Sequence, residues 1–269
     1  MAVDFEFKDR YNIDDLIEIV TLLRAPGGCP WDREQTHESI RKNFIEETYE
    51  VIEAINKNST EGLKEELGDV LLQVALHTEM EREKGNFDFD DVCNDICQKL
   101  VIRHPHVFGD VNAENSEEAL KSWDEVKKQT KGNKTQSQSL MDVPVELPAL
   151  MRAQKVQSRA AKVGFDWDTI DGAYDKVAEE INELKIAINH NSQSEIEDEL
   201  GDVLFSMVNV SRFLKVDSEE ALKGATDKFI SRFRLVEALA KEKGISMSEA
   251  SIEELDGLWE IAKEIKNAE

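Results

Sequence analysis

Apolar residues recur at helical spacing along the chain. Leu16, Ile17, Val20 and Leu23 lie on one face of a helix, and the breaker segment 25–28, with one proline and two glycines, follows them. The alternation typical of strands is not sustained anywhere in the 269 residues. With only 5 prolines and 13 glycines, this pattern predicts an all-α fold.

A polar segment divides the sequence into two halves. Residues 129–139 lack large apolar side chains, and Pro144 and Pro148 follow them. This composition is typical of a linker between domains. We therefore predict an N-terminal module, a linker and a C-terminal module, with bounds 1–128, 129–147 and 148–269.

The two predicted modules contain the same acidic pattern. Residues 46–51 read EETYEV and 179–184 read EEINEL, while 66–72 read ELGDVLL and 199–205 read ELGDVLF. Both pairs are offset by 133 positions, so we interpret the chain as an internal duplication. An asparagine-rich turn separates the two acidic stretches of each copy, which predicts two helical hairpins with turns at 56–59 and 189–192.

Acidic side chains converge in each predicted hairpin. Residues three or four positions apart share a helix face, so Glu46 or Glu47 lies beside Glu50, and Glu66 lies beside Asp69. Unit charges at about 4 Å repel by roughly 4 kcal/mol at an effective dielectric of 20, so a cation is needed among them. The same argument applies to the second copy, with Glu179, Glu180, Glu183, Glu199 and Asp202.

The ligand chemistry of these carboxylates favours a hard divalent cation. Oxygen ligands without a Cys or His partner select Mg²⁺ or Mn²⁺ over zinc. The opposing interpretation is that acidic runs on helices are solvated faces. Against it, apolar residues at 70–72 and 203–205 directly follow each ExxD motif and place the acidic groups at the edge of a buried surface.

Basic residues also recur in both copies. Lys99 and Arg103, four positions apart, are echoed by Lys228 and Arg232. Two cations on one helix stripe can bind a polyphosphate, although such a pair is also common on surfaces and in salt bridges.

Two further residue types have a structural and a functional interpretation. Trp259, echoed by Trp123, either stacks on a base or fills the core. Lys176 lies four residues before Glu180, so it either contacts phosphate or forms a pair within its helix.

The charge balance excludes other classes of protein. The chain has 33 Lys and Arg against 57 Asp and Glu, a formal charge of −24. Such a surface repels nucleic acids and anionic membranes, so we expect neither as a partner. We also expect no signal peptide or membrane span. Cys29, Cys93 and Cys97 do not form a disulfide framework, and we predict a cytoplasmic protein.

The joint set of motifs resembles one family. CPWDREQTHESI at 29–40, RHPHVFGD at 103–110 and VGFDWD at 163–168, together with the duplicated acidic pattern, are similar to the bacterial MazG nucleoside triphosphate pyrophosphohydrolases over nearly the whole chain. The acidic pattern alone also occurs in all-α pyrophosphatases that act on dUTP, dCTP or phosphoribosyl-ATP.

The resemblance implies a fold and an activity. It implies a homodimer of tandem all-α MazG modules, and Mg²⁺-dependent hydrolysis between the α and β phosphates of NTPs and dNTPs, ATP included. The products are the nucleoside monophosphate and pyrophosphate, the base specificity is broad, and the role is housecleaning of the nucleotide pool.

The resemblance also implies roles for residues, mainly in the second copy, with the first degenerate or used in recognition. The metal ligands it implies are Glu180, Glu183, Glu199 and Asp202 in the second copy, and Glu47, Glu50, Glu66 and Asp69 in the first. Nucleotide contacts are assigned to Lys176, Glu179, Asp202, Lys228, Arg232 and Trp259. Glu179 or Glu180 then orients or deprotonates the attacking water.

Two other functions remain open from the residues alone. A non-hydrolytic regulator could use the acidic helices to bind a nucleotide or a basic protein partner. A purely structural helical dimer leaves the repeated Lys, Arg and Trp positions unexplained. Complete carboxylate sets with fixed spacing in both copies favour the enzyme.

Overall fold

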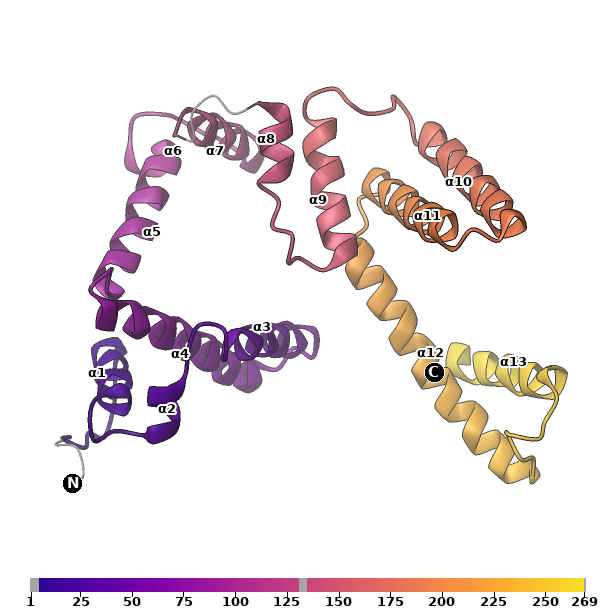
Figure 1. The fold of residues 1–269 in the computed structure, drawn as a ribbon, viewed down its shortest axis with the longest axis horizontal. Coiled ribbons are helices and arrows are strands. Elements are labelled where there is room, and N and C mark those ends of the chain that lie inside the picture. The colour runs from indigo at the N-terminus through magenta and orange to yellow at the C-terminus, as the bar shows by residue number, and fades with distance from the viewer. Residues whose placement is uncertain (1–4, 131–134, 269) are drawn as a thin grey trace. The chain divides into compact units, whose positions relative to one another are not determined.

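The computed structural model describes residues 5–130 and 135–268, and within them every regular element is a helix (Figure 1). The predicted all-α fold is confirmed. The chain divides into two compact units, unit 1 over Met1–Gly132 and unit 2 over Asn133–Glu269. None of the helices in the described ranges is long and apolar enough to cross a membrane.

Unit 1 is built around the pairing of its third and fourth helices. Its helices are α1 (Ile13–Arg24), α2 (Pro30–Glu34), α3 (Arg41–Asn56), α4 (Thr60–Lys84), α5 (Phe89–Arg103), α6 (Pro105–Phe108) and α7 (Ser116–Thr130). Helix α4 packs on both α3 and α1. The buried core joins these elements and consists of Val20, Ile40, Ala75, Leu76 and Met80.

Unit 2 contains a second helical pair and two separate cores. Its helices are α8 (Gln136–Met141), α9 (Ala149–Ala161), α10 (Ile170–His190), α11 (Gln193–Phe213), α12 (Ser218–Lys243) and α13 (Ile252–Ala268). Ala173, Val177 and Val210 form the core between α10 and α11. A different core joins α12 to α13, through Val236, Ala240, Leu258 and Ala262.

The two predicted hairpins are present, as α3–α4 and α10–α11. Asn58 and Asn191 take left-handed backbone angles, with φ of 52° and 53°, which asparagine tolerates better than most residues. Ser59 then begins α4, because its side chain accepts a hydrogen bond from the Gly62 amide. Both turns therefore contain a left-handed asparagine, but Ser192, unlike Ser59, makes no side-chain cap at the start of its helix.

The segment predicted as a linker is partly helical. Helix α8 lies inside the range 129–147 and packs against α9 of unit 2. Its Thr135 forms a capping box with Gln138, which explains why a polar stretch begins a helix. Residues 131–134 of the predicted linker lie outside the described residues.

Candidate metal and nucleotide site

The carboxylates of the second hairpin converge on Glu180. Oxygen atoms of Glu180, Glu199 and Asp202 lie within 4.8 Å of one another, and those of Glu179, Glu180 and Glu183 form a second such group. Glu180 belongs to both groups, so it links the carboxylates of α10 to those of α11, five acidic residues in all. We call these five residues the unit 2 cluster.

Glu180 is a buried acidic residue. Ala173, Val177 and Glu180 lie on the buried face of α10, and Glu180 is only 4% exposed. One of its oxygens, Oε2, is buried and has no hydrogen-bond partner among the described residues. A buried carboxylate oxygen without a partner is costly, and it is the feature expected where a cation binds.

Burial and like charge raise the pKa of two members of the unit 2 cluster. The pKa of Glu183 is raised by burial and by the nearby carboxylates of Glu180 and Glu199. Burial and the charges of Glu180 and Asp202 raise the pKa of Glu199. Both shifts mean that the ionised cluster is unfavourable by itself.

Lys176 supplies the positive charge in contact with this cluster. Its Nζ lies 2.8 Å from Glu179 Oε1 and 2.5 Å from Glu180 Oε1. Hydrogen bonds to Glu179 and Glu180 raise the pKa of Lys176, so it stays protonated. Of the two interpretations of Lys176, the structure contains the ion pair within its own helix.

The basic and aromatic residues assigned to nucleotide binding, Lys228, Arg232 and Trp259, lie on the last two helices of unit 2. Lys228 and Arg232 lie on α12, and Trp259 lies on α13. The Arg232 guanidinium is 5.9 Å from the Trp259 ring centroid, and Arg232 Nε is buried without a hydrogen-bond partner in the described part of the chain. Helix α12 runs away from the α10–α11 hairpin (Figure 1). In unit 2, the carboxylates thus lie on α10 and α11, whereas the basic and aromatic residues lie on α12 and α13.

Unit 1 contains the matching acidic cluster. Oxygens of Glu47, Glu66 and Asp69 lie within 4.8 Å of one another, with each residue half-buried. Burial and the charge of Asp69 raise the pKa of Glu47. Burial and the charge of Glu50 do the same for Glu66, so Glu50 faces the cluster too. We call these four residues the unit 1 cluster.

Both clusters fit a hard divalent cation. The candidate ligands in both clusters are all carboxylates, which suit Mg²⁺ or Mn²⁺. The Glu180 Oε2 atom offers unit 2 a ligand atom that no group in the described ranges uses. The residues that would hold the ion there are Glu180, Glu183, Glu199 and Asp202.

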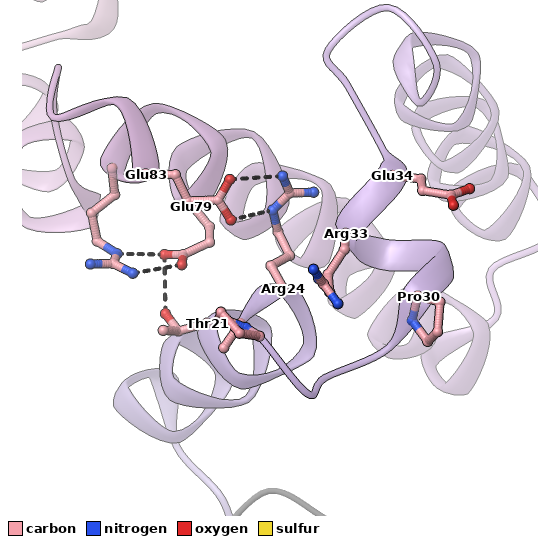
Figure 2. A pocket seen from close by; sticks show the side chains of 10 residues that line it. Thr21, Arg24, Pro30, Arg33, Glu34, Glu79 and Glu83 are labelled. Carbon is pink, nitrogen blue, oxygen red and sulfur yellow. Dashed lines mark hydrogen bonds and ion pairs between the residues drawn. The ribbon is translucent and has the colours of Figure 1, made fainter. Parts of the chain in front are cut away.

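A pocket of about 480 Å³ lies elsewhere in unit 1, between α1, α2 and α4 (Figure 2). Arg24 binds Glu83 through two hydrogen bonds of 2.8 and 2.9 Å. Arg82 binds Glu79 in the same way, and Thr21 donates to Glu79 as well. The Arg24–Glu83 pair and the Thr21–Glu79 hydrogen bond join α1 to α4, whereas the Arg82–Glu79 pair lies within α4. None of the unit 1 cluster lines the pocket.

Sequence reasoning missed the burial of Glu180 and the distance of α12 from the carboxylates. The first has a signal in the sequence, because Ala173, Val177 and Glu180 follow the spacing of one helix face. The second has none, since the position of α12 depends on long-range packing.

Comparison with known proteins assigns the family. A family model described as the MazG nucleotide pyrophosphohydrolase domain matches residues 35–108 and 169–237. The chain belongs to this family, and the two matched segments confirm the internal duplication. Each segment contains one of the acidic hairpins.

Full-length relatives are similar over most of the chain. The nucleoside triphosphate pyrophosphohydrolase/pyrophosphatase MazG of Thermotoga maritima is 47% identical over 250 residues, covering 93% of this chain and 95% of that protein. The nucleoside triphosphate pyrophosphohydrolase of Escherichia coli K12 is 45% identical over 254 residues, covering 93% and 97%. The uncharacterized protein YabN of Bacillus subtilis is 46% identical, covering 91% of this chain and 50% of that protein.

Proposed function

We propose that this protein is a cytoplasmic, Mg²⁺-dependent nucleoside triphosphate pyrophosphohydrolase whose main catalytic site is the unit 2 cluster. The observation that carries the proposal is Glu180, a buried carboxylate with one unpartnered oxygen that belongs to both groups of the unit 2 cluster. It lies inside a segment matched by the family model. The names of the relatives from Thermotoga maritima and Escherichia coli support the same activity.

The chemistry follows from the charges at the site. A bound Mg²⁺ supplies polarisation of phosphate oxygens and lowers the pKa of water. Glu179 is more exposed than Glu180, with 57% of its side chain accessible, and can take the proton of an attacking water. Water adds to the α phosphorus, and the bond from this phosphorus to the oxygen that bridges it to the β phosphorus breaks. The products are the nucleoside monophosphate and pyrophosphate. Lys228 and Arg232 stabilise the charge on the departing pyrophosphate.

Trp259 supports broad base specificity. Its ring lies 5.1 Å from Phe229 and below the Arg232 guanidinium, so an aromatic and cationic platform is already assembled. Stacking on such a platform tolerates every base, because each base has a π face. We therefore propose that NTPs and dNTPs are all accepted, and that the protein clears the nucleotide pool.

We propose a homodimer because the site of one chain is incomplete. Among the described residues of unit 2, no ion pair joins Lys228 or Arg232 to the unit 2 cluster. Helices α10, α11 and α12 also expose large apolar side chains, which mark an interaction surface: Ile181, Leu200, Leu204, Phe205, Leu222, Phe229 and Ile230. A second copy would cover this surface and bring its α12 and α13 to the carboxylates.

The activity is tested by incubating the full chain with a panel of NTPs and dNTPs in the presence and absence of Mg²⁺. We expect equal amounts of monophosphate and pyrophosphate, only with the metal, and none from Asp202→Asn. Release of orthophosphate would place the cleavage at another bond. Binding without any turnover would instead favour the non-hydrolytic regulator.

The shared site is tested by complementation between inactive chains. Asp202→Asn removes a carboxylate and Arg232→Met removes a cation, so each homodimer should be inactive. When the two variants are unfolded and refolded together, mixed dimers should recover activity, because one of the two sites is intact. If the mixture stays as inactive as the separate variants, the shared site is wrong.

A further inference from the structure

Lys176, which we assign to nucleotide binding, is already paired with two carboxylates of the unit 2 cluster. Its ammonium group lies 2.5 Å from Glu180, the residue shared by both carboxylate groups of the unit 2 cluster. Its side chain is 37% exposed, whereas that of Glu180 is only 5% exposed. The ammonium group therefore belongs to a much more exposed side chain and balances the charge of the most buried carboxylate of the cluster.

We propose that Lys176 couples metal binding to nucleotide binding by acting as the counter-ion of the metal-free cluster. This inference rests on the proposed function, because it takes the cluster to be the metal site. Lys176 lowers the affinity for a metal ion that arrives alone. Nucleotide phosphates remove this effect, since they attract the ammonium group away from Glu180.

Coulomb repulsion is the physical basis of the coupling. A divalent cation held by Glu180 and its neighbours lies close to the Lys176 ammonium, and both compete for the same carboxylate. The lysine stem is flexible and its end reaches solvent, so the charge can move toward a phosphate. Phosphate oxygens then balance both cations, and metal and nucleotide strengthen each other's binding.

Unit 1 contains no lysine at the equivalent position. Asn43 lies 133 residues before Lys176, and it stands three and four residues before Glu46 and Glu47 as Lys176 stands before Glu179 and Glu180. The same helix face therefore carries a neutral side chain in one copy and a cation in the other. The coupling is thus a property of unit 2.

The test measures Mn²⁺ binding by the electron paramagnetic resonance signal of the free ion. The full chain carries Glu47→Gln and Asp69→Asn, which remove the unit 1 cluster, so that the ions counted belong to unit 2. In this background, Lys176→Met should bind Mn²⁺ about tenfold more tightly without nucleotide, within the usual range of coupling effects. Lys176→Arg keeps the charge and should bind as the parent does.

A second measurement adds an ATP analogue whose α and β phosphates are joined by a methylene group. The analogue should strengthen Mn²⁺ binding by the parent more than by Lys176→Met, because only the parent has the coupling residue. Lys185→Met is the matched control, since Lys185 is an exposed lysine of the same helix and should change neither value. Circular dichroism checks that each variant is folded.

Two results would overturn the inference. One is that Lys176→Met binds Mn²⁺ no more tightly than the parent does, or that neither protein binds Mn²⁺. The other is an equal gain from the analogue in both proteins. Failure of the proposed function is distinguishable, because it appears as absent pyrophosphate release by the wild-type chain.

Discussion

The hairpins α3–α4 and α10–α11 have the same acidic residues at the same spacing but different charge environments. Glu180 is 4% exposed and has Lys176 beside it, whereas its counterpart Glu47 is half-buried with Asn43 in the lysine position. The pKa of Glu47 is raised by burial and by neighbouring carboxylates. The duplication therefore preserved the geometry of the carboxylates and changed how their charge is balanced.

The largest expected effect separates the two clusters by activity. Glu180→Gln should lower pyrophosphate release by at least about 100-fold, because metal ions contribute several kcal/mol to such reactions and about 1.4 kcal/mol is a factor of ten. Glu47→Gln should cause a much smaller loss. Steady-state assays of both full-length variants provide the measurement. Equal losses would show that the two clusters act as one catalytic unit or contribute alike.

The next effect is the stability gained from the metal. Mg²⁺ at about 100 times its dissociation constant should stabilise the fold by about 2.7 kcal/mol for each occupied cluster, measured by urea unfolding with and without EDTA. Ionic strength is matched with NaCl. A chain carrying Asp69→Asn and Asp202→Asn should lose this gain, and a persistent gain would place the metal elsewhere.

This gain should depend on pH. The pKa values of Glu66 and Glu199 are raised in the folded state, so their contribution to stability is present below their unfolded pKa and is lost as pH rises through the folded value. The metal-free protein should therefore lose this contribution as pH rises. Mg²⁺ binds the ionised form, so the gain from Mg²⁺ should grow over the same range. A gain that falls with pH would contradict this sign.

A smaller effect is expected when the counter-ion is moved between the copies. Asn43→Lys should weaken Mn²⁺ binding by the unit 1 cluster about tenfold, since it places a cation beside Glu46 and Glu47. Titration is carried out in an Asp202→Asn background that removes the unit 2 site. Asn43→Gln is the neutral control and should leave the affinity unchanged. Tighter binding by the lysine variant would contradict the electrostatic explanation.

The smallest effect concerns the turns, which should behave alike. Asn58→Ala and Asn191→Ala should each lower stability by about 1 kcal/mol, because alanine is unfavourable at positive φ. Glycine at either position should be nearly neutral. Denaturant unfolding measures all four variants. A large difference between the two alanine variants would show that the turns are not equivalent.

Much of the fold could be predicted from local spacing. The hairpins could be predicted because their signals are local: the turns at Asn58 and Asn191, and the carboxylates three and four residues apart. The helix α8 within the predicted linker depends on the Thr135 cap and on packing against α9. The course of α12, which carries Arg232, depends on tertiary packing, about which helical spacing gives no information.

The central claim is that the carboxylates around Glu180 hold the catalytic metal. The most direct measurement is an anomalous difference map from crystals grown with Mn²⁺ and the methylene analogue of ATP. We predict a peak between Glu180, Glu199 and Asp202, with the analogue's phosphates beside it. A map without a peak there, and with the analogue bound at another surface, would contradict the account.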